Sequence, residues 1–335
     1  MLWVSADQNK KTKKIGLKRR ADMCGIIAAA SERNVGKLLV KGLHKMEYRG
    51  YDSAGIALHQ KDQIAHLRTL GKVKLLEEKM ISEKPKSKLG IAHTRWATHG
   101  EPSEENAHPH KSNERVYIVH NGIIENYIEL KNFLKKEGYN FSSQTDSELI
   151  AHMIEYFLGQ GNNMLDSMYL TKNKLDGAYA IAAIDKNDDT KITIARSKSP
   201  LLIGIGKYGS LAASDPLAIS GLTNKFIFLE DGDVAEISSK EYKIYDDSKN
   251  EVQRDISQID ISNEATSKGS YRHFMEKEIY EQPDAILNTI DGRVGGDDVL
   301  DNIFGLGSSE VFAKVKRIQI VACGTSLHAG RVAAN

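Results

Sequence analysis

A cysteine thiol stands where it could act as a nucleophile, because Cys24 directly follows an internal methionine, Met23. If translation begins at Met23 and that methionine is removed, or if the preceding residues are removed by processing, the thiol lies on the first residue and the free α-amine serves as its base. An α-amine has a pKa of about 7.7–8.0, so a useful fraction is neutral at pH 7. In the printed chain, however, 23 residues precede Cys24, and its nitrogen is an amide without basicity. A cysteine at the start of an apolar strand is more often a small buried hydrophobe, so the residue by itself leaves both interpretations open.

A second candidate is Arg95, within the segment His93–Gly100. A guanidinium can bind a carboxylate through two parallel hydrogen bonds. The small residues that follow would suit a loop that closes over a ligand. An arginine beside a tryptophan, here Trp96, also occurs in plain surface packing, and this motif alone does not decide between the two.

The dipeptide Asn121-Gly122 follows an apolar, β-branched run, Val116–His120. Asn-Gly is usually the turn of a β-hairpin, but a helical pattern follows here instead of a second strand. We therefore expect the pair to lie between a strand and a helix. There, a side-chain amide and a backbone N–H could together form an oxyanion hole.

A carboxylate, Asp146, lies in the segment Thr145–Glu148. The spacing Thr-x-x-Glu predicts a capping box that opens a helix through Leu158. An aspartate in the first turn of a helix is favoured by the helix dipole. Alternatively, the same carboxylate could pair with a substrate ammonium group.

Five of the eleven histidines lie within 28 residues of one another, which raises the question of a zinc site. They are His93, His99, His108, His110 and His120. No His-Glu-x-x-His or Cys-x-x-Cys spacing accompanies them, so we expect no metal and no other cofactor. Near the end of the chain, Thr325 and Ser326 lie between a predicted strand and a predicted helix, a position that suits a phosphate.

Short apolar runs and helical spacings alternate along the chain from Cys24 onward. Apolar residues in Val35–Met46 have helical spacing, and Cys24–Ala30 and Ala178–Ile184 are strand-like. Gly138 is expected just after the end of a helix that contains Ile123 and Leu134. Beyond residue 240 the sequence is more polar, with one helix expected near Phe274–Ile279.

Composition and charge exclude several classes of protein. Apolar residues make up 40% of the 335 residues and charged residues 27%, as in ordinary globular proteins, and two cysteines exclude a disulfide framework. The longest apolar runs are far shorter than the roughly 18 residues of a membrane helix. The formal net charge of +1 combines +5 in residues 1–23 with −4 in the remainder. A basic terminal block can mark a nucleic-acid arm or a targeting segment, but its composition favours a disordered extension.

Several of these segments together resemble one family. They are Cys24-Gly25-Ile26, residues 48–55 (YRGYDSAG), residues 93–101, residues 120–126 (HNGIIEN) and Thr145-Asp146. They are similar to the class II glutamine amidotransferase domain, and more narrowly to the glutamine–fructose-6-phosphate aminotransferase (glucosamine-6-phosphate synthase) family. Residues 271–275 and 277–283 resemble the interdomain region of that family, and Cys323-Gly324-Thr325-Ser326 resembles the start of its sugar-isomerase domain.

The resemblance implies a role for each candidate residue. Cys24 would attack the amide of L-glutamine and release ammonia, and Asn121 and Gly122 would stabilise the oxyanion. Arg95 would bind the α-carboxylate of glutamine and Asp146 its α-amine. The residues of the closing loop would be Trp96, Thr98 and His99. Thr325 and Ser326 would contact the phosphate of fructose 6-phosphate, which the family aminates to glucosamine 6-phosphate.

The resemblance also implies an architecture. We expect an α+β, four-layer αββα sandwich of the N-terminal nucleophile hydrolase type, followed by a linker and a truncated α/β sugar-isomerase domain. The expected boundaries are 1–22 for the basic extension, 23–240 for the glutaminase domain, 241–310 for the linker and 311–335 for the isomerase start. We further expect a cytoplasmic enzyme, a homodimer in its full-length form, with no nucleic acid and no membrane as partner.

Two departures leave alternatives open. Residues 1–22 and Met23 block the α-amine of Cys24 unless they are removed, and the chain holds only a stub of the isomerase domain, so it could at most hydrolyse glutamine. Alternatives are another class II amidotransferase, of the amidophosphoribosyltransferase or asparagine synthetase type, and a catalytically dead module that only binds. A nucleic-acid-binding protein acting through the basic extension is a further, weaker alternative.

Overall fold

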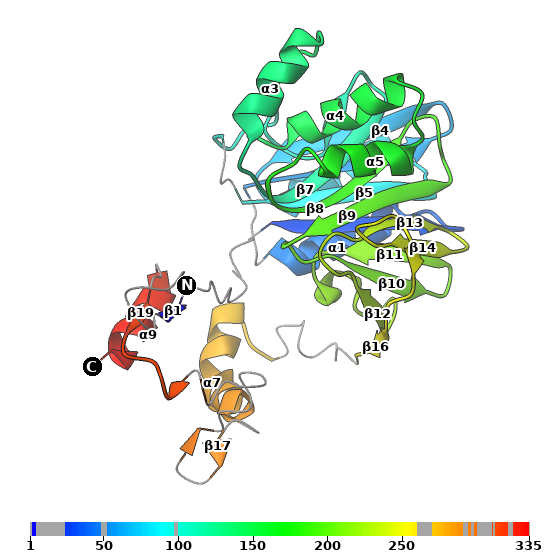
Figure 1. Ribbon diagram of the computed structural model, residues 1–335. Coiled ribbons are helices and arrows are strands. Elements are labelled where there is room, and N and C mark those ends of the chain that lie inside the picture. Colours follow the sequence, from blue (N-terminus) through cyan, green and yellow to red (C-terminus); the bar gives the residue numbers. More distant parts are fainter. Residues whose placement is uncertain are drawn as a thin grey trace. The chain divides into compact units, whose positions relative to one another are not determined.

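A computed structural model describes residues 2–4, 24–47, 52–96, 100–259, 270–290, 294–295, 298–299, 310, 312–320 and 324–334 (Figure 1). The chain divides into two compact units, one over Asp22–Thr266 and one that combines Met1–Ala21 with Ser267–Asn335. None of the described helices is both long and apolar enough to cross a lipid bilayer.

One antiparallel sheet of the larger unit contains the strand that begins directly after Cys24. Its spatial order is β16 (Ile256–Gln258), β12 (Lys225–Phe228), β10 (Leu202–Gly206), β11 (Gly209–Ala213), β2 (Gly25–Ser31), β5 (Leu89–Arg95), β3 (Ser53–Gln60) and β4 (Gln63–Leu70). Gly25 of β2 pairs with Thr94 of β5, and Arg95 of β5 pairs with Ser53 of β3. This register brings the start of β2 beside the end of β5.

The second antiparallel sheet contains the Asn121-Gly122 segment. Its order is β15 (Glu251–Val252), β14 (Tyr242–Tyr245), β13 (Val234–Ser238), β9 (Lys191–Ser197), β8 (Gly177–Asp185), β7 (Val116–Ile124) and β6 (His110–Ser112). β7 pairs with β8 along its whole length, with Asn121 opposite Ala180 and Gly122 opposite Tyr179.

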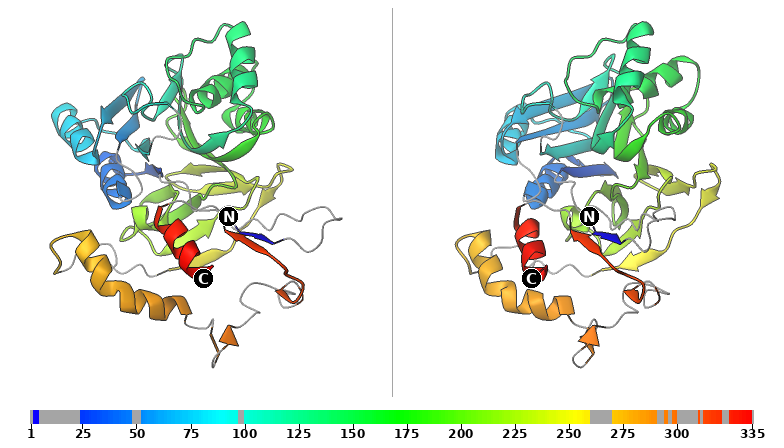
Figure 2. Two further views of the ribbon diagram at one scale, coloured as in Figure 1. Left: turned by 90° about the vertical axis from the view of Figure 1, so that its left-hand side faces the viewer. Right: turned by 60° about the vertical axis from the view of Figure 1, so that its left-hand side comes forward.

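The two sheets pack face to face between two layers of helices (Figures 1 and 2). The alternation of side chains along a strand separates the layers. In β2, Ile26 and Ala28 lie in the core between the sheets, whereas Ile27 and Ala29 lie in the core beneath the helices of the first sheet. A fully buried isoleucine such as Ile26 or Ile27 contributes about 1.5–3 kcal/mol. The expected αββα sandwich is therefore present in the described part of the chain.

The helices cover the outer faces of both sheets. The first sheet carries α1 (Gly36–Met46), α2 (Val73–Glu83) and the short 3₁₀ helix η2 (Pro216–Ile219), and the second carries α3 (Tyr127–Lys136), α4 (Glu148–Gly159) and α5 (Met164–Lys172). In α1, Leu39, Leu43 and Met46 recur at helical spacing and are fully buried. The helix predicted for Val35–Met46 is thus confirmed, and Gly138 lies just beyond α3 with φ +90°, as predicted for a residue that ends a helix.

The sheets extend further along the chain than residue 240. β14, β15 and β16 lie between Tyr242 and Gln258, and each pairs with a strand of one of the two sheets. The compact unit accordingly continues to Thr266. Residue 240, the boundary expected from the sequence, lies within this compact unit. The strands beyond it are short and polar and show little periodicity, so the sequence did not indicate them.

The smaller unit contains α7 (Phe274–Ile290), β17 (Val294–Gly295), β18 (Asp298–Val299), β19 (Ile318–Ile320), α9 (Gly324–Ala333) and β1 (Leu2–Val4). β1 pairs with β19 in antiparallel fashion, although the basic extension is expected to be disordered. The other residues of the expected 1–22 extension, together with Cys323, lie outside the described residues. The helix predicted near Phe274 is present and runs on through Pro283.

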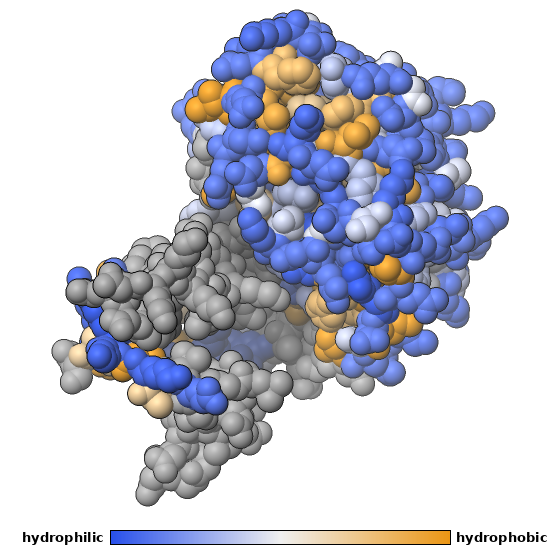
Figure 3. All heavy atoms as spheres, viewed as in Figure 1, coloured by the Kyte–Doolittle hydropathy of each residue, from blue (hydrophilic) through white to orange (hydrophobic). Residues whose placement is uncertain are grey.

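One outer face of the larger unit is mainly hydrophilic, with apolar side chains gathered over α3, α4 and α5 (Figure 3). A groove there is lined by residues of α3 and α4, including Phe133, Met153 and Phe157. Met153 and Phe157 belong to the apolar core beneath the second helical layer, whereas Phe133 is exposed.

Candidate active site

Cys24 lies at the entrance to β2, with its sulfur against the backbone of Trp96. The N–H of Trp96 donates a hydrogen bond to Cys24 Sγ at 3.3 Å, and Sγ lies 3.5 Å from the carbonyl oxygen of Trp96. The pairing of Gly25 with Thr94 explains this contact, because it places Cys24 opposite the end of β5. An N–H that points at the sulfur stabilises negative charge there. Cys24 is half-buried and forms no disulfide, as a nucleophilic thiol requires.

Arg95 holds a positive charge beside this thiol. Its side chain is buried, and Nη2 donates to the carbonyl oxygen of Gly100 at 3.2 Å. Burial lowers the pKa of Arg95, while the negative charges of Asp52, Cys24 and Asp146 raise it. The guanidinium therefore lies within electrostatic range of both Cys24 and Asp146, and it remains protonated at neutral pH.

Asn121 connects the second sheet to the cysteine. Its Nδ2 donates to the backbone carbonyl oxygen of Cys24 at 3.2 Å, and its Oδ1 lies 2.9 Å from Nε2 of His93. Only 1% of Asn121 is exposed. Tyr117 and Val119 of the same strand face the core between the sheets, so the period of two turns Asn121 to that side as well. Asn121 and Cys24, which lie 97 residues apart in sequence, are thus in direct contact.

Gly122 is a point of close backbone approach. Its φ is +134°, and a Cβ built there would lie only 1.9 Å from the carbonyl oxygen of Ala178 on β8. No other residue type fits such a position without strain. The sequence-based placement of Asn121-Gly122 between a strand and a helix is wrong, because β7 continues through both residues to Ile124 and α3 begins only at Tyr127. Pairing with β8 holds the segment in the sheet.

Asp146 is buried beside the end of β7. Its Oδ2 accepts a hydrogen bond from the backbone N–H of Ile124 at 2.8 Å, and its Oδ1 lies 3.4 Å from Ser147 Oγ. This anchors a carboxylate next to the Asn121-Gly122 segment. The site therefore has a cation and an anion, Arg95 and Asp146, near one thiol, an arrangement that suits the two charged ends of a free amino acid.

The predicted capping box at Thr145 and Glu148 is not formed. α4 begins at Glu148, and its N-cap, Ser147, makes no side-chain capping bond. The Glu148 carboxylate instead accepts hydrogen bonds from the backbone N–H groups of Ser142 and Ser143. Burial alone would raise the pKa of Glu148, but hydrogen bonds from His152, Ser142 and Ser143 outweigh it and lower this pKa.

A cluster of buried histidines, His93, His108, His110 and His120, lies behind the site. His93 stacks on His108 with ring centres 4.2 Å apart, and His108 contacts His110 edge-on at 4.5 Å. Burial lowers the pKa of His93 and of His110 to about 3 and that of His108 well below its usual value. The three rings are therefore neutral at pH 7.

The histidine cluster also holds the segment that contains Asp146. Thr145 Oγ1 lies 3.0 Å from Nε2 of His110, and Ser147 Oγ lies 2.8 Å from Nδ1 of His120. Among the described residues, no three His, Cys, Asp or Glu side chains are arranged to hold a metal ion. The cluster thus connects β5 and β7 with the segment before α4.

The other five predicted site residues are Trp96, Thr98, His99, Thr325 and Ser326. Trp96 is 40% exposed at the end of β5, so its ring remains open to solvent. Thr98 and His99 lie outside the described residues. Thr325 and Ser326 lie in the first turn of α9, in the smaller unit, and their side chains are not among those described. The structure thus brings together Cys24, Arg95, Asn121, Gly122 and Asp146.

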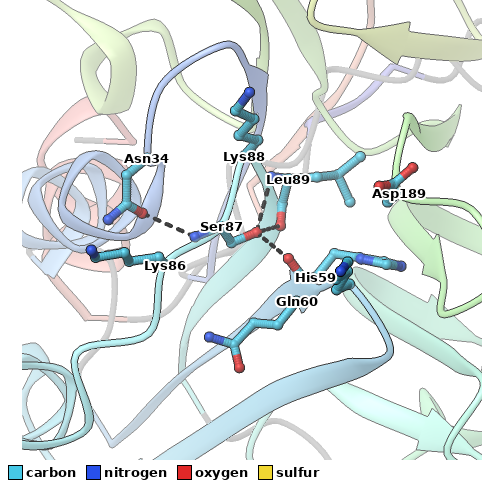
Figure 4. A pocket seen from close by; sticks show the side chains of 9 residues that line it. Asn34, His59, Gln60, Lys86, Ser87, Lys88, Leu89 and Asp189 are labelled. Carbon is cyan, nitrogen blue, oxygen red and sulfur yellow. Dashed lines mark hydrogen bonds between the residues drawn. The ribbon is translucent and has the colours of Figure 1, made fainter.

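A separate pocket of about 370 Å³ lies at the other end of the first sheet (Figure 4). Its lining includes His59, Ser87 and Leu89, and Leu89 pairs with Ala30 at the opposite end of β2 from Cys24. Ser87 Oγ is already bonded to the carbonyl oxygens of His59 and Leu89 at 2.6 Å each. This pocket is therefore distinct from the site at Cys24.

Sequence reasoning missed the residue that holds Asn121. From the sequence, His93 is a possible zinc ligand and part of the segment His93–Gly100, and nothing indicates that it is a partner of Asn121. The contact joins strands of two different sheets, 28 residues apart in sequence. No local pattern signals such a pairing, although His93 and Arg95 lie two and four residues after the buried Ile91, and this even spacing places both on the inner face of β5.

Comparison with known proteins identifies the family. A family profile described as a glutamine amidotransferase domain matches residues 93–220. Glutamine–fructose-6-phosphate aminotransferases (isomerizing) of Vibrio vulnificus (strain CMCP6) and Haemophilus influenzae (strain ATCC 51907 / DSM 11121 / KW20 / Rd) are 47% and 49% identical to this chain over 312 and 313 residues. Each match covers 93% of this chain and 51% of the relative, so the chain spans about half the length of these relatives.

The fold recurs in a solved structure. Glutamine phosphoribosylpyrophosphate amidotransferase from B. subtilis, complexed with ADP and GMP, matches with a TM-score of 0.59 and 25% identity, over 68% of this chain and 50% of that chain. The sequence match to the fructose-6-phosphate aminotransferases is much closer. The chain therefore belongs to the glutamine–fructose-6-phosphate aminotransferase family, of whose members it spans about half.

Proposed function

We propose that this chain hydrolyses L-glutamine to glutamate and ammonia, with Cys24 as the nucleophile. The observation that supports this most directly is the convergence of Cys24, Arg95, Asn121 and Asp146 at one place between the two sheets. Membership of an amidotransferase family supports the same reaction. The match covers half of each relative, and the activity of this chain is therefore a proposal.

The reaction begins with a proton transfer from the Cys24 thiol to the α-amine of the same residue. The thiolate attacks the side-chain carbonyl carbon of glutamine, forming a C–S bond and a tetrahedral oxyanion. The Nδ2 of Asn121 and the N–H of Gly122 stabilise that oxyanion. Collapse breaks the C–N bond, the α-ammonium returns its proton to the leaving group, and ammonia departs. Water then hydrolyses the thioester to glutamate and the free thiol.

This mechanism requires that Cys24 be the first residue of the active form. The α-amine is a base only when no peptide bond joins it to Met23. We therefore propose cleavage between Met23 and Cys24. The Trp96 N–H that points at Sγ supports the reaction in this form, because it stabilises the attacking thiolate.

The charged side chains select the substrate. Arg95 binds the α-carboxylate of glutamine and Asp146 its α-amine, while Trp96, Thr98 and His99 belong to the loop that closes over it. A compound without either charged group leaves a buried partner unmatched, which costs far more than a missing methylene. We expect poor hydrolysis of such glutamine analogues.

Beyond glutamine, the proposal includes the second half of the family reaction. The ammonia would aminate fructose 6-phosphate in the full-length protein, with Thr325 and Ser326 as phosphate contacts at the start of a truncated sugar-isomerase domain. We place the glutaminase domain at residues 23–240, the linker at 241–310 and the isomerase start at 311–335, and the first strands of the linker, up to residue 258, pair with the sheets of the glutaminase domain. The full-length enzyme would be a cytoplasmic homodimer.

The main alternatives are amidotransferases with another acceptor and a module that only binds. The solved phosphoribosylpyrophosphate amidotransferase shares the fold at 25% identity, whereas the fructose-6-phosphate aminotransferases reach 47–49% identity, which favours the latter. A binding module would have no use for a thiol held against an N–H donor.

The test compares the full chain with a form that begins at Cys24, by measuring glutamate release from glutamine. We expect release only from the form that begins at Cys24. Cys24→Ala in the same form should abolish release while leaving the unfolding transition unchanged. Equal release from Cys24→Ala would contradict the nucleophile assignment, and no release from either form would favour a binding module.

A further inference from the structure

The contact between His93 and Asn121 gives the histidine cluster a role in the reaction. We propose that His93 is a positioning residue, whose ring N–H holds the Asn121 side chain so that its amide N–H groups point toward Cys24. The inference rests on the proposed function and deepens it, since it names what keeps one oxyanion donor in place.

The direction of each hydrogen bond follows from chemistry. The backbone carbonyl oxygen of Cys24 can only accept, so the Asn121 atom 3.2 Å from it must be Nδ2. The Oδ1 atom then faces His93, and it too can only accept. Nε2 of His93, 2.9 Å away, must therefore carry a hydrogen. Of the two Nδ2 hydrogens, one goes to Cys24 and the second remains for a substrate oxyanion.

The protonation state of His93 agrees with this assignment. Its pKa is lowered to about 3, chiefly by burial and to a smaller extent by the charges of Arg95 and His120, although the hydrogen bonds to Asn121 and to the His120 backbone act in the opposite direction. The ring is neutral at working pH and has a single N–H, on Nε2. A neutral donor holds Asn121 without placing a competing charge beside the oxyanion.

The ring of His93 is itself held in place. It is 1% exposed and stacks on His108 at 4.2 Å with an angle of 30° between the planes. Nδ1 of His108 accepts from the backbone N–H of His120, the residue before Asn121, at 3.3 Å. The His108 ring thus contacts the backbone of β7, and the His93 ring contacts the Asn121 side chain. Reorientation of the Asn121 amide would break the bonds to His93 and to Cys24 together.

The test replaces His93 by a residue that lacks the donor and by one that restores it. Leu fills a similar volume without a hydrogen-bond donor, whereas the amide N–H of Gln can reach Asn121 Oδ1. In the form that begins at Cys24, we expect His93→Leu to lower kcat about 10- to 100-fold, part of the roughly 10²–10³-fold effect of losing an oxyanion donor. KM for glutamine should change little, and His93→Gln should recover most of kcat.

A matched control is His59→Leu. His59 is also buried and bonded, with Nε2 2.8 Å from the carbonyl oxygen of Lys186, and it lies at the other end of the sheet. This variant should lose stability in the same way and keep its kcat. Alkylation of Cys24 by iodoacetamide, which needs no oxyanion hole, should proceed at the wild-type rate in His93→Leu. A kcat of His93→Leu equal to that of His59→Leu would overturn the inference.

A second readout separates this inference from the proposed function. The side-chain NH₂ of Asn121 should give two resolved ¹H–¹⁵N resonances in the wild type, which collapse or shift in His93→Leu and return in His93→Gln. If the wild type releases no glutamate, the proposed function fails, and these resonances still decide the role of His93. Unchanged Asn121 resonances in His93→Leu would refute it.

Discussion

Replacement of Gly122 by alanine tests the link between the sheet and the oxyanion site. The backbone at Gly122 has φ +134°, and a new Cβ would lie 1.9 Å from the Ala178 carbonyl oxygen. Holding a residue with a side chain at such a φ costs about 1–3 kcal/mol. Relief of the overlap by shifting β7 from β8 costs about 1–3 kcal/mol more. We expect a loss of about 2–6 kcal/mol in the free energy of unfolding, out of the roughly 5–15 kcal/mol that a folded domain has.

Urea unfolding of Gly122→Ala, followed by circular dichroism, measures this loss, and two other glycines separate its parts. Gly138 has φ +90° but no atom within 4 Å of a Cβ, so Gly138→Ala isolates the backbone cost of about 1–2 kcal/mol. Gly159 has open space and an ordinary φ, and Gly159→Ala should stabilise by about 0.4–1 kcal/mol. A Gly122→Ala protein within about 0.5 kcal/mol of the wild type, the normal range for neutral surface changes, would refute the reasoning. Failure to fold would place the loss at the upper end.

Two further predictions concern the charged and titratable groups. Arg95→Lys keeps the charge but loses the two-pronged geometry, so we expect KM for glutamine to rise roughly 10- to 150-fold, equivalent to about 1.5–3 kcal/mol; an unchanged KM in glutaminase kinetics would show that Arg95 does not bind the carboxylate. Burial lowers the pKa of His93 to about 3 and that of His66 to about 4, so the unfolded chain binds more protons below pH 6.5. Stability is therefore complete above about pH 6.5 and falls as the pH decreases, by up to about 1.4 kcal/mol per pH unit for each such histidine. Urea unfolding between pH 7 and 5 measures this slope, which His66→Gln should reduce; a slope of zero in the wild type would contradict neutral burial.

Local patterns predicted the elements whose apolar residues have helical spacing or form one continuous run. The helical spacing of Leu39, Leu43 and Met46 is enough to predict α1, and the apolar run after Cys24 is enough to predict β2. The resemblance of the motifs implied the αββα sandwich and the residues that meet around Cys24. The predictions of α1 and β2 depend on local sequence alone, because the spacing of apolar residues indicates which face of an element is buried.

Tertiary pairing decided the features that the sequence did not indicate. β7 continues through Asn121-Gly122 because β8 supplies hydrogen-bond partners to Ile124, and an isolated Asn-Gly would favour a turn. The short polar strands beyond residue 240 are defined by their pairing, because β15 and β16 lie at sheet edges and β14 lies between β13 and β15. The bond between His93 and Asn121 requires two sheets to face each other, which no spacing within one segment encodes.

The central claim is that Cys24 forms a covalent bond with the substrate. The most direct measurement is rapid acid quenching of the form that begins at Cys24 during turnover with glutamine, followed by peptide mass spectrometry. We predict a γ-glutamyl adduct on the peptide that begins at Cys24, absent from Cys24→Ala and from a chain that retains Met23. Glutamate release without any adduct on that peptide, or with the adduct on another residue, would contradict the account.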